Sequence, residues 1–412
     1  MAQIAIMGHG TVGSGVAEVL MKNARSLERK TGGPIEIKYI LDLRDFPGLS
    51  YSDKFIKDFN LILNDPEISV VVEVMGGLHP AYDFVKACLE DGKSVVTSNK
   101  ELVAAKGAEL LAIAAEKNVN FLFEASVGGG IPIIRPLHQC LGANEITEIA
   151  GILNGTSNFI LTKMICEGSA FDDALAEAQR LGYAEANPAA DVEGMDACRK
   201  ICILASLAFG KHIYPDSVPT AGITAITPAD VQYAADWGGV IKLLGRASRD
   251  EETQQVQIAV SPCFISHDSQ LASVDDVFNG ILVRGDATGD VVFYGKGAGK
   301  LPTASAVVAD IIDVIKAGGT ISTLHWKDSD GSSLADPDDE ILACYLRIQG
   351  ENAAEAVSAA FGPCDVLHRA DAPKDEFACI LPAMAAGERH AKLEALSAAG
   401  FAVLGSIVVA EV

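Results

Sequence analysis

The chain has 412 residues, and this length usually divides into two or three domains because a single hydrophobic core stops growing at about 250–300 residues. Its formal net charge of −23 argues against binding to nucleic acid, because the phosphate backbone requires a basic surface. No apolar run is long enough to span a membrane and the N-terminus lacks the basic segment of a signal peptide, so we expect a soluble cytoplasmic protein with no membrane partner.

The nine cysteines are scattered along the chain, and none lies in a CxxC pair or in a Cys/His cluster at zinc spacing. An odd count without a pattern indicates a reducing compartment. Cys198 and Cys202 are one helical turn apart, where we expect reduced thiols in a helix core.

A short apolar strand, a glycine turn and a helical pattern follow one another in the first 22 residues. The glycines fit the GxGxxG motif in the strand–helix context that the motif requires. They permit the tight turn and let the backbone approach a pyrophosphate, which then meets the helix N-terminus. The residues expected to bind a dinucleotide here are Gly8, Gly10, Thr11, Val12 and Gly13.

The second expected strand, residues 35–41, ends next to two charged side chains. Asp42 could accept hydrogen bonds from the ribose hydroxyls, as in proteins that use NAD, whereas Arg44 could pair with a 2′-phosphate, as in proteins that use NADP. Both could also be plain loop charges. The sequence leaves the choice between the two cofactors open.

Further strands are expected within residues 69–77, 94–100 and 119–130, and helix-like stretches separate them. This alternation predicts an α/β fold with a doubly wound parallel sheet. Ligands of such sheets bind outside the carboxyl ends of the strands, so the residues at these ends are candidates for a site.

The carboxyl ends of the strands expected within residues 69–77 and 94–100 suggest contacts with a nicotinamide. Met75 and Gly76 let the backbone come close to a flat ring, although a plain turn explains them equally well. Ser98 or Asn99 can cap the following helix, which places Lys100 in its first turn, where a nicotinamide should end. Lysines in first turns are also often simply exposed.

The carboxyl end of the strand expected within residues 119–130 suggests a cation site. Glu124 precedes a loop with three consecutive glycines, residues 128–130, which could turn several carbonyl oxygens inward beside a carboxylate. Hard cations prefer such an oxygen-rich setting, but a glycine-dependent turn would look the same.

The middle of the chain carries an unusual acidic segment. A strand near residue 146 is followed by Gly155-Thr156-Ser157-Asn158, a turn that can cap a helix. The acidic segment follows this turn and runs directly into a helix that contains Lys200. At helical spacing, Glu193, Asp196 and Lys200 share one face of that helix, and the face continues as an apolar stripe. The plain alternative is an i,i+4 ion pair worth a few tenths of a kcal/mol, on the order given for helix surfaces.

The remaining segments complete the domain plan. Residues 294–315 form a glycine loop that contains Gly297 and enters an apolar helix expected to return to the nucleotide domain. We expect a dinucleotide-binding domain at 1–140, completed by about 297–325, a substrate-binding and dimerisation domain at 141–296, a polar linker at 326–340 and a βαββαβ module at 341–412. The function of that module, dimerisation or small-molecule regulation, does not follow from its residues.

Taken together, these motifs resemble homoserine dehydrogenases of the monofunctional type with a C-terminal ACT domain. The resemblance covers essentially the whole chain and is carried, in the order of the family, by MGHGTVGSGV, TSNKELVA, EASVGGGIPII, ILNGTSNFI, LGYAEANPAADVEGMDACRKICILA and GKGAGKLPTASAVVADI. It implies a Rossmann-type domain, an α+β substrate and dimerisation domain, and a ferredoxin-like ACT module.

The resemblance also implies an activity, which is the reversible reduction of L-aspartate 4-semialdehyde to L-homoserine with NADPH or NADH in threonine and methionine biosynthesis. It implies that Lys200 is the catalytic acid/base, that Lys100 takes part in catalysis near the nicotinamide, and that Asp196 holds the substrate or orients the lysine. The other substrate residues implied are Gly155, Thr156, Tyr183, Glu185 and Asp191. A monovalent cation, usually sodium, is implied at Glu124 and the carbonyl groups of Val127, Gly129 and Ile131, and Arg44 matches the arginine that selects NADP.

The family further suggests a dimer or tetramer and feedback by an amino acid such as threonine. The expected chemistry also follows from the residues, because reducing an aldehyde requires a proton at oxygen, which a lysine can supply if its pKa is tuned by burial or a neighbouring cation. Two other functions would account for part of this sequence. One is another NAD(P)-dependent dehydrogenase of amino-acid metabolism, which would lack the segment leading to Lys200; the other is a nucleotide-sensing regulator without turnover, which would not need both lysines.

Overall fold

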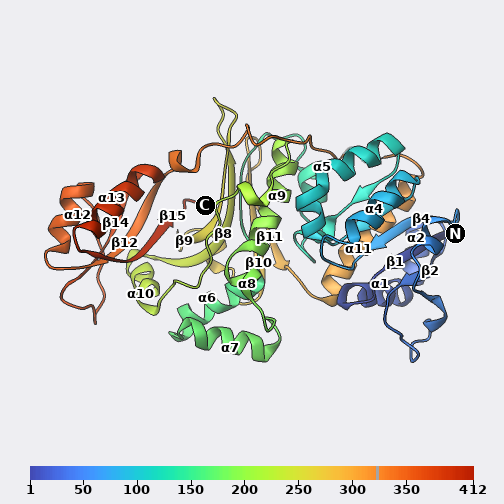
Figure 1. The fold of residues 1–412 in the computed structure, drawn as a ribbon, viewed down its shortest axis with the longest axis horizontal. Coiled ribbons are helices and arrows are strands. Elements are labelled where there is room, and N and C mark those ends of the chain that lie inside the picture. The colour runs from blue at the N-terminus through green and yellow to red at the C-terminus, as the bar shows by residue number, and fades with distance from the viewer. Residues whose placement is uncertain (322–323) are drawn as a thin grey trace. The chain divides into compact units, whose positions relative to one another are not determined.

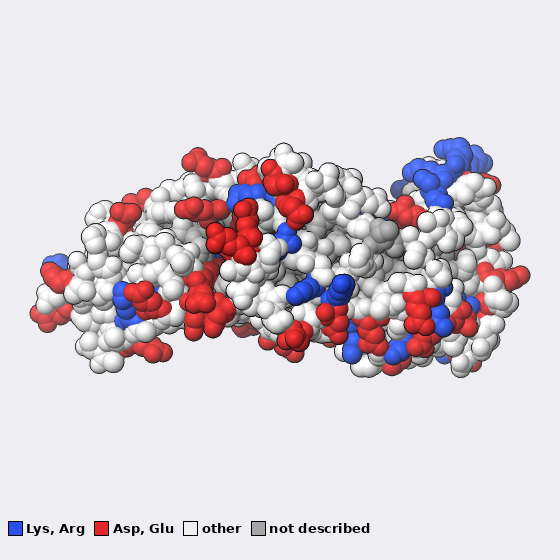
Figure 2. Space-filling view, turned by 90° about the horizontal axis from the view of Figure 1, so that it is seen from above, with Lys and Arg blue, Asp and Glu red and all other residues white. Residues whose placement is uncertain are grey.

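The computed structural model describes residues 1–321 and 324–412, which form two compact units. Unit 1 comprises residues 1–144, 202–215 and 295–330, and unit 2 comprises residues 145–201, 216–294 and 331–412. Among the described helices, none combines the length and the apolar character needed to cross a membrane. Figure 2 shows acidic side chains spread over the visible face of the molecule, so the net charge of −23 is not confined to one segment.

Unit 1 is built on a six-stranded sheet in the order β3-β2-β1-β4-β5-β6. Its strands are β1 (Ala2–Met7), β2 (Ile35–Leu41), β3 (Phe55–Ile56), β4 (Ile68–Glu73), β5 (Ser94–Thr97) and β6 (Phe121–Leu122). All neighbours are parallel, which confirms the predicted doubly wound sheet. The strand order reverses between β1 and β4, the point where such sheets bind dinucleotides.

Three of these strands are shorter than expected, and each ends where the backbone must turn. β4 ends at Glu73 instead of Gly77, and β5 ends at Thr97, just before the helix cap. The largest difference is β6, because the expected strand at 119–130 is confined to two residues and a short 3₁₀ turn, Glu124–Ser126, follows. The site candidates Met75, Lys100 and Glu124 therefore follow these strands and are not part of them.

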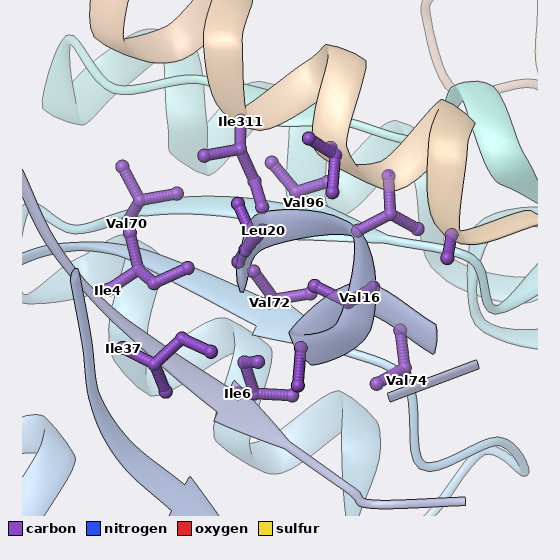
Figure 3. Packing of buried hydrophobic residues seen from close by; sticks show 14 of the residues in the cluster. Ile4, Ile6, Val16, Leu20, Ile37, Val70, Val72, Val74, Val96 and Ile311 are labelled. Carbon is purple, nitrogen blue, oxygen red and sulfur yellow. The ribbon is translucent and has the colours of Figure 1, made fainter. Parts of the chain in front are cut away.

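Helices cover both faces of this sheet. They are α1 (Thr11–Lys22), α2 (Ala24–Thr31), α3 (Asn60–Leu63), α4 (Ala81–Glu90), α5 (Lys100–Lys117) and α11 (Lys300–Ala317). In Figure 3 the strand residues Ile4 and Val72 pack against Val16 of α1 and Ile311 of α11, and all four are fully buried. At Gly15 a Cβ atom would lie 2.7 Å from the carbonyl oxygen of Lys300, so this glycine permits the close approach of α1 and α11.

Unit 2 is built on a nine-stranded sheet in the order β11-β10-β7-β8-β9-β15-β12-β14-β13. The first half consists of β7 (Ile146–Ile152), β8 (Gly239–Arg249), β9 (Val256–Ser266), β10 (Phe278–Gly285) and β11 (Gly289–Lys296). The helices of this half are α6 (Gly155–Glu167), α7 (Phe171–Leu181), α8 (Ala189–Val192), the start of α9 (Met195–Phe209) and α10 (Pro228–Trp237). Helices α6 and α10 pack on β8 and on each other.

The C-terminal part has the predicted βαββαβ order. Its elements are β12 (Ile341–Gln349), α12 (Ala353–Phe361), β13 (Asp365–Val366), β14 (Glu376–Ala385), α13 (Ala386–Ala398) and β15 (Ala402–Val409). Its strands pair antiparallel in the order β15-β12-β14-β13. This sheet does not stand alone, because Val408 and Val409 of β15 pair in parallel with Cys263 and Phe264 of β9.

A buried ion pair also joins the C-terminal strands to α10. The Nε of Arg347 on β12 donates to Oδ1 of Asp230 at 3.0 Å, and the Tyr345 hydroxyl donates to the same oxygen at 3.0 Å. The other carboxylate oxygen of Asp230 accepts the N–H and the hydroxyl of Thr227, which caps α10. The sequence did not indicate this junction.

The expected linker at 326–340 begins inside a core. Trp326 is buried, its indole N–H donates to Nδ1 of His212 at 2.8 Å, and Nε2 of His212 lies 2.9 Å from the carbonyl oxygen of Ala104. A Cβ atom at Gly107 of α5 would lie 2.5 Å from the indole ring, so this glycine makes room for the tryptophan. The segment is polar in composition, but its first residue, Trp326, is part of the core.

We predict that Trp326→Ala lowers the free energy of unfolding of unit 1 by about 3–5 kcal/mol, the usual cost of truncating a buried aromatic residue. Asp339→Ala, an exposed position of the same segment, should change it by less than about 0.5 kcal/mol. Urea unfolding followed by far-ultraviolet circular dichroism measures both. Equal effects of the two substitutions would show that Trp326 does not belong to the core.

Candidate active site

The glycine turn between β1 and α1 has the geometry of a phosphate-binding turn. Gly8 has a φ of +100°, and a Cβ atom at Gly13 would lie 2.0 Å from the carbonyl oxygen of Gly8, so both positions require glycine. Gly10 differs, because it is the N-cap of α1 and a Cβ atom there would meet no described atom within 4 Å. Thr11 and Val12 begin α1, whose first N–H groups are available to an anion.

A cavity of about 540 Å³ lies beside this turn. Its walls are largely apolar, and its polar rim is formed by the end of β2. The lining residues are Gly8, His9, Gly10, Leu41, Asp42, Leu43, Arg44, Lys57, Phe59, Val74, Met75, Pro80 and Phe84. An apolar slot of this size next to a glycine turn and a helix N-terminus fits the adenosine half of a dinucleotide.

Asp42 and Arg44, the two residues expected to bear on the choice between NAD and NADP, line this cavity and bind each other. Oδ1 of Asp42 accepts the backbone N–H and Nε of Arg44 at 2.9 and 3.0 Å, and Oδ2 accepts the second guanidinium nitrogen at 2.9 Å. The Arg44 guanidinium holds the pKa of Asp42 well below its usual range, and Asp42 in turn raises the pKa of Arg44. Oδ2 of Asp42 also accepts the N–H of His9 at 2.8 Å, which ties β2 to the glycine turn.

Glu73 is a site residue that the sequence analysis missed. It ends β4, is fully buried, and its Oε1 accepts the N–H groups of Met75 and Gly76 at 2.8 and 3.3 Å. Its Oε2 accepts the hydroxyl of Thr97 at 2.6 Å. Burial raises the pKa of Glu73, and these hydrogen bonds oppose the rise. A carboxylate inside the apolar run of residues 69–74 was the signal available.

The start of α5 is joined to the same turn. Asn99, not Ser98, caps the helix, because its side-chain oxygen accepts the N–H of Leu102 at 3.1 Å. The Nδ2 of Asn99 donates to the carbonyl oxygen of Gly77 at 2.7 Å. Lys100 is therefore the first residue of α5. It directly follows Asn99, whose side chain binds the glycine turn after Met75.

The loop after β6 is organised by Glu124, which is buried. Its Oε1 accepts the N–H groups of Ile133 and Ile134 at 2.6 and 3.0 Å, and its Oε2 accepts that of Arg135 at 2.8 Å. A Cβ atom at Gly129 would lie 2.3 Å from the carbonyl oxygen of Gly297, so this loop packs tightly on the loop before α11.

Asp310 of α11 supports the same loop from behind. Its Oδ2 accepts the N–H of Glu124 at 2.9 Å, and its Oδ1 accepts a guanidinium N–H of Arg135 at 2.8 Å. Burial, reinforced by the charge of Glu124, raises the pKa of Asp310 to about 8. Neither Asp310 nor Arg135 was expected at the site, because only the folded chain brings them together.

In unit 2, Lys200 and Asp196 form the predicted pair on α9. Both side chains are more than nine-tenths buried, at 7% and 3% exposure. The Nζ of Lys200 donates to Oδ2 of Asp196 at 2.8 Å and to the carbonyl oxygen of Leu153 at 2.7 Å. This pair therefore lies inside the protein and does not close a solvated helix end.

Glu193 does not share this face, contrary to the expectation from helical spacing. It follows α8 as its C-cap and is exposed, and Gly194, with a φ of +85°, separates it from the start of α9 at Met195. A left-handed glycine interrupts the helix, so the spacing of 3.6 residues per turn does not extend across it.

The start of α6 also differs from expectation. The cap is not the turn at residues 155–158, which forms the first helical turn, but Asn154, whose side-chain oxygen accepts the N–H of Ser157 at 2.8 Å. The Nδ2 of Asn154 donates to Oδ1 of Asp191 at 2.7 Å and to Oδ2 of Asp196 at 2.8 Å. Asn154, like Glu73, Asp310 and Arg135, was missed by the sequence analysis.

The remaining expected substrate residues lie around this start of α6. Gly155 begins the helix, where a Cβ atom would lie 2.7 Å from the carbonyl oxygen of Val277, and the hydroxyl of Thr156 donates to the carbonyl oxygen of Tyr183 at 2.7 Å. Tyr183 is 43% exposed and packs edge-on against Phe159. Glu185 is exposed in the same segment, whereas Asp191 reaches Asn154.

Unit 1 thus has the fold and the turn of an NAD(P)-dependent dehydrogenase, and unit 2 holds a buried lysine beside carboxylates. Two family models match the chain, "Homoserine dehydrogenase, NAD binding domain" over residues 8–124 and "Homoserine dehydrogenase" over residues 132–312. The chain belongs to the homoserine dehydrogenase family and is an NAD(P)-dependent oxidoreductase.

Individual relatives agree with this assignment. Homoserine dehydrogenase from Synechocystis sp. is 44% identical over 355 residues, which are 83% of this chain and 77% of the relative. The enzyme from Pseudomonas aeruginosa is 46% identical over 316 residues, 76% of this chain and 72% of the relative.

Solved structures match in fold as well. A homoserine dehydrogenase structure from Thiobacillus denitrificans has a TM-score of 0.88 at 38% identity and covers 99% of this chain and 98% of its own. A hyperthermophilic archaeal homoserine dehydrogenase in complex with NADPH has a TM-score of 0.64 at 29% identity over 76% of this chain and 97% of its own.

We predict that Gly10→Ala leaves the melting temperature unchanged but raises the Kd for NADPH at least about tenfold, because the added methyl group meets only the cofactor. Gly13→Ala should lower both the melting temperature and the affinity, because its methyl group collides with Gly8. Thermal unfolding and quenching of protein fluorescence by NADPH measure the two effects. Unchanged affinity in Gly10→Ala would place the pyrophosphate elsewhere.

Proposed function

We propose that the chain catalyses the reversible reduction of L-aspartate 4-semialdehyde to L-homoserine, with Lys200 as the general acid and base. The observation that carries this proposal is the burial of Lys200, whose Nζ is held at 2.8 Å from Asp196 and 2.7 Å from the Leu153 carbonyl oxygen. The second of these partners directly precedes Asn154 and Gly155, so Nζ lies beside the start of α6.

The chemistry requires a hydride at the aldehyde carbon and a proton at its oxygen. The nicotinamide cofactor supplies the hydride when it is bound. Lys200 donates the proton to the carbonyl oxygen during reduction, and as the neutral amine it accepts the hydroxyl proton of homoserine during oxidation. Asp196 orients Nζ, because its Oδ2 and the Leu153 carbonyl fix two of the three hydrogen-bonding directions of the ammonium group.

The acidic groups near Lys200 are suited to an amino-acid substrate. An α-ammonium group requires carboxylate partners, and Asp191, Asp196 and Glu185 provide them in this segment. Thr156 holds the backbone at Tyr183, and we assign Gly155, Thr156 and Tyr183 to the substrate as well. In unit 1 we assign Met75, Gly76, Ser98, Lys100 and Gly297 to the nicotinamide half of the cofactor, with Lys100 as a second catalytic cation.

The cofactor site has the residues for both NAD and NADP. The carboxylate of Asp42 can accept the ribose hydroxyls of NAD, whereas Arg44, 63% exposed in its side chain, can turn from Asp42 to a 2′-phosphate. Because Asp42 and Arg44 bind each other at 2.9 Å, the 2′-phosphate of NADPH competes with Asp42 for the guanidinium.

We extend the proposal to a monovalent cation, such as sodium, in the loop of Val127, Gly129 and Ile131. The described residues contain no cluster of three or more Cys, His, Asp or Glu side chains that could hold a metal ion, so the ligands would be main-chain carbonyl oxygens. Because the carboxylate of Glu124 accepts three backbone N–H groups, its role there is to fix the loop and to supply negative charge.

The same proposal assigns a regulatory role to residues 341–412. Their βαββαβ order supports an ACT-type module with an amino-acid effector such as threonine, in a cytoplasmic dimer or tetramer. A regulator without turnover is the competing function, and the enzyme assay below separates the two.

We predict that Lys200→Ala abolishes turnover while the Kd for NADPH stays within about twofold, because Lys200 acts on the substrate oxygen. Lys163→Ala is the matched control, since Lys163 also forms an i,i+4 pair, with Glu167, but on a partly exposed face of α6. Nicotinamide absorbance with L-homoserine and NAD or NADP measures turnover of both variants.

Near-normal turnover of Lys200→Ala would refute the assignment of the acid/base. A wild-type protein that binds the nucleotide but turns over homoserine with neither cofactor would instead favour the regulator.

We further predict that Arg44→Ala raises the KM for NADPH about tenfold or more and changes the KM for NADH less, because only NADPH carries the 2′-phosphate. Lys30→Ala, an exposed cation at the end of α2, controls for the general loss of positive charge. Steady-state kinetics with each cofactor measure the effect, and equal changes for NADPH and NADH would rule out Arg44 as the selecting residue.

A further inference from the structure

We propose that Asn154 is a positioning residue that holds Asp191 and Asp196 together as one receptor for the α-ammonium group of the substrate. This inference rests on the proposed function, since it presumes that the site beside Lys200 binds an amino acid. It concerns a neutral residue that touches neither the reacting oxygen nor the cofactor in the proposed mechanism.

The direction of the Asn154 amide is fixed by the helix that it caps. Its side-chain oxygen accepts the N–H of Ser157 at 2.8 Å, and it is 6% exposed, so the amide cannot turn into water. With the oxygen committed to the helix, the NH₂ group faces the acidic segment. Its two hydrogen atoms are both used, one toward Asp191 at 2.7 Å and one toward Asp196 at 2.8 Å.

Two carboxylates that contact the same nitrogen atom repel each other, and the repulsion is strong where water is excluded. The amide offsets this repulsion by donating to both without adding charge. The α-ammonium of an amino acid placed beside the two carboxylates can donate charge-assisted hydrogen bonds to both. An apolar or acidic residue in place of Asn154 would let the two carboxylates move apart.

Asn154 also acts on the catalytic lysine. Oδ2 of Asp196 accepts from both Asn154 and Lys200, so the amide and the ammonium share one acceptor. Lys200 donates in addition to the carbonyl oxygen of Leu153, the residue directly before Asn154. The cap of α6, the ammonium receptor and the position of Nζ are therefore set by two consecutive residues of the chain.

The alternative is that Asn154 is only a helix cap. Asn154→Ser separates the two roles, because serine is an equally good N-cap but cannot reach both carboxylates. We expect its Kd for NADPH to equal that of the wild type and its melting temperature to fall, because Asp191 and Asp196 lose the donor between them. Asn64→Ser, at an exposed C-cap of α3, makes the same chemical change outside the site and serves as the control.

The decisive measurement is the inhibition constant of substrate analogues against homoserine oxidation. We expect Asn154→Ser to raise the KM for homoserine and the inhibition constant of L-2-aminobutyrate by about ten- to a hundredfold, as for the loss of charge-assisted hydrogen bonds. The inhibition constant of butyrate, which lacks the ammonium group, should stay within about twofold. A role in the fold alone would weaken both inhibitors equally.

Two results overturn the inference. If Asn154→Ser retains the wild-type KM and inhibition constants, Asn154 is only a cap. If both inhibitors weaken together, the pocket as a whole has changed and the receptor role is wrong. Failure of the proposed function is distinct from either result, because the wild type itself would then show no oxidation of homoserine.

Discussion

A carboxylate taken out of water must be matched by hydrogen bonds or by a cation, and the site of this protein is arranged around that constraint. Glu73, Glu124, Asp196 and Asp230 are nearly or fully buried, and each lies at or beside the end of a strand or helix. Glu124 is matched by backbone N–H groups and Asp196 by side-chain donors, whereas Glu73 and Asp230 accept both kinds. Three of these carboxylates lie where a ligand group is expected, and Asp230 fixes the C-terminal strands to α10.

Much of the site could be predicted from the sequence, because the relevant spacing is local. The turn at Gly8–Gly13 depends on adjacent residues, and the Lys200–Asp196 pair depends on one helical turn. Glycine also explains where local reasoning fails, since Gly194 breaks the helical phase that would have placed Glu193 on the same face. The alternation of strands and helices likewise predicted the parallel sheet of unit 1 and the βαββαβ order of residues 341–412, whereas strands β8 to β11 of the second sheet were not predicted.

Most of the residues that were missed have partners that are distant in the sequence; Glu73, which binds Met75 and Gly76, is the exception. Asn154 binds carboxylates 37 and 42 residues away, and Asp310 binds the backbone of Glu124 across 186 residues. A periodic pattern cannot reveal such pairs, since it reports only which side of an element is apolar. Trp326 was expected in a linker because polar residues dominate the composition of the segment that follows it, whereas this aromatic residue is buried.

The pairing of β15 with β9 has a consequence for the integrity of the second sheet. Val408 and Val409 supply backbone hydrogen bonds to an inner strand, so a chain that ended before residue 402 would leave β9 as an open edge. An open, apolar strand edge is a template for pairing with other chains. The last strand of the sequence thus protects the middle of the protein from self-association, whatever the C-terminal helices bind.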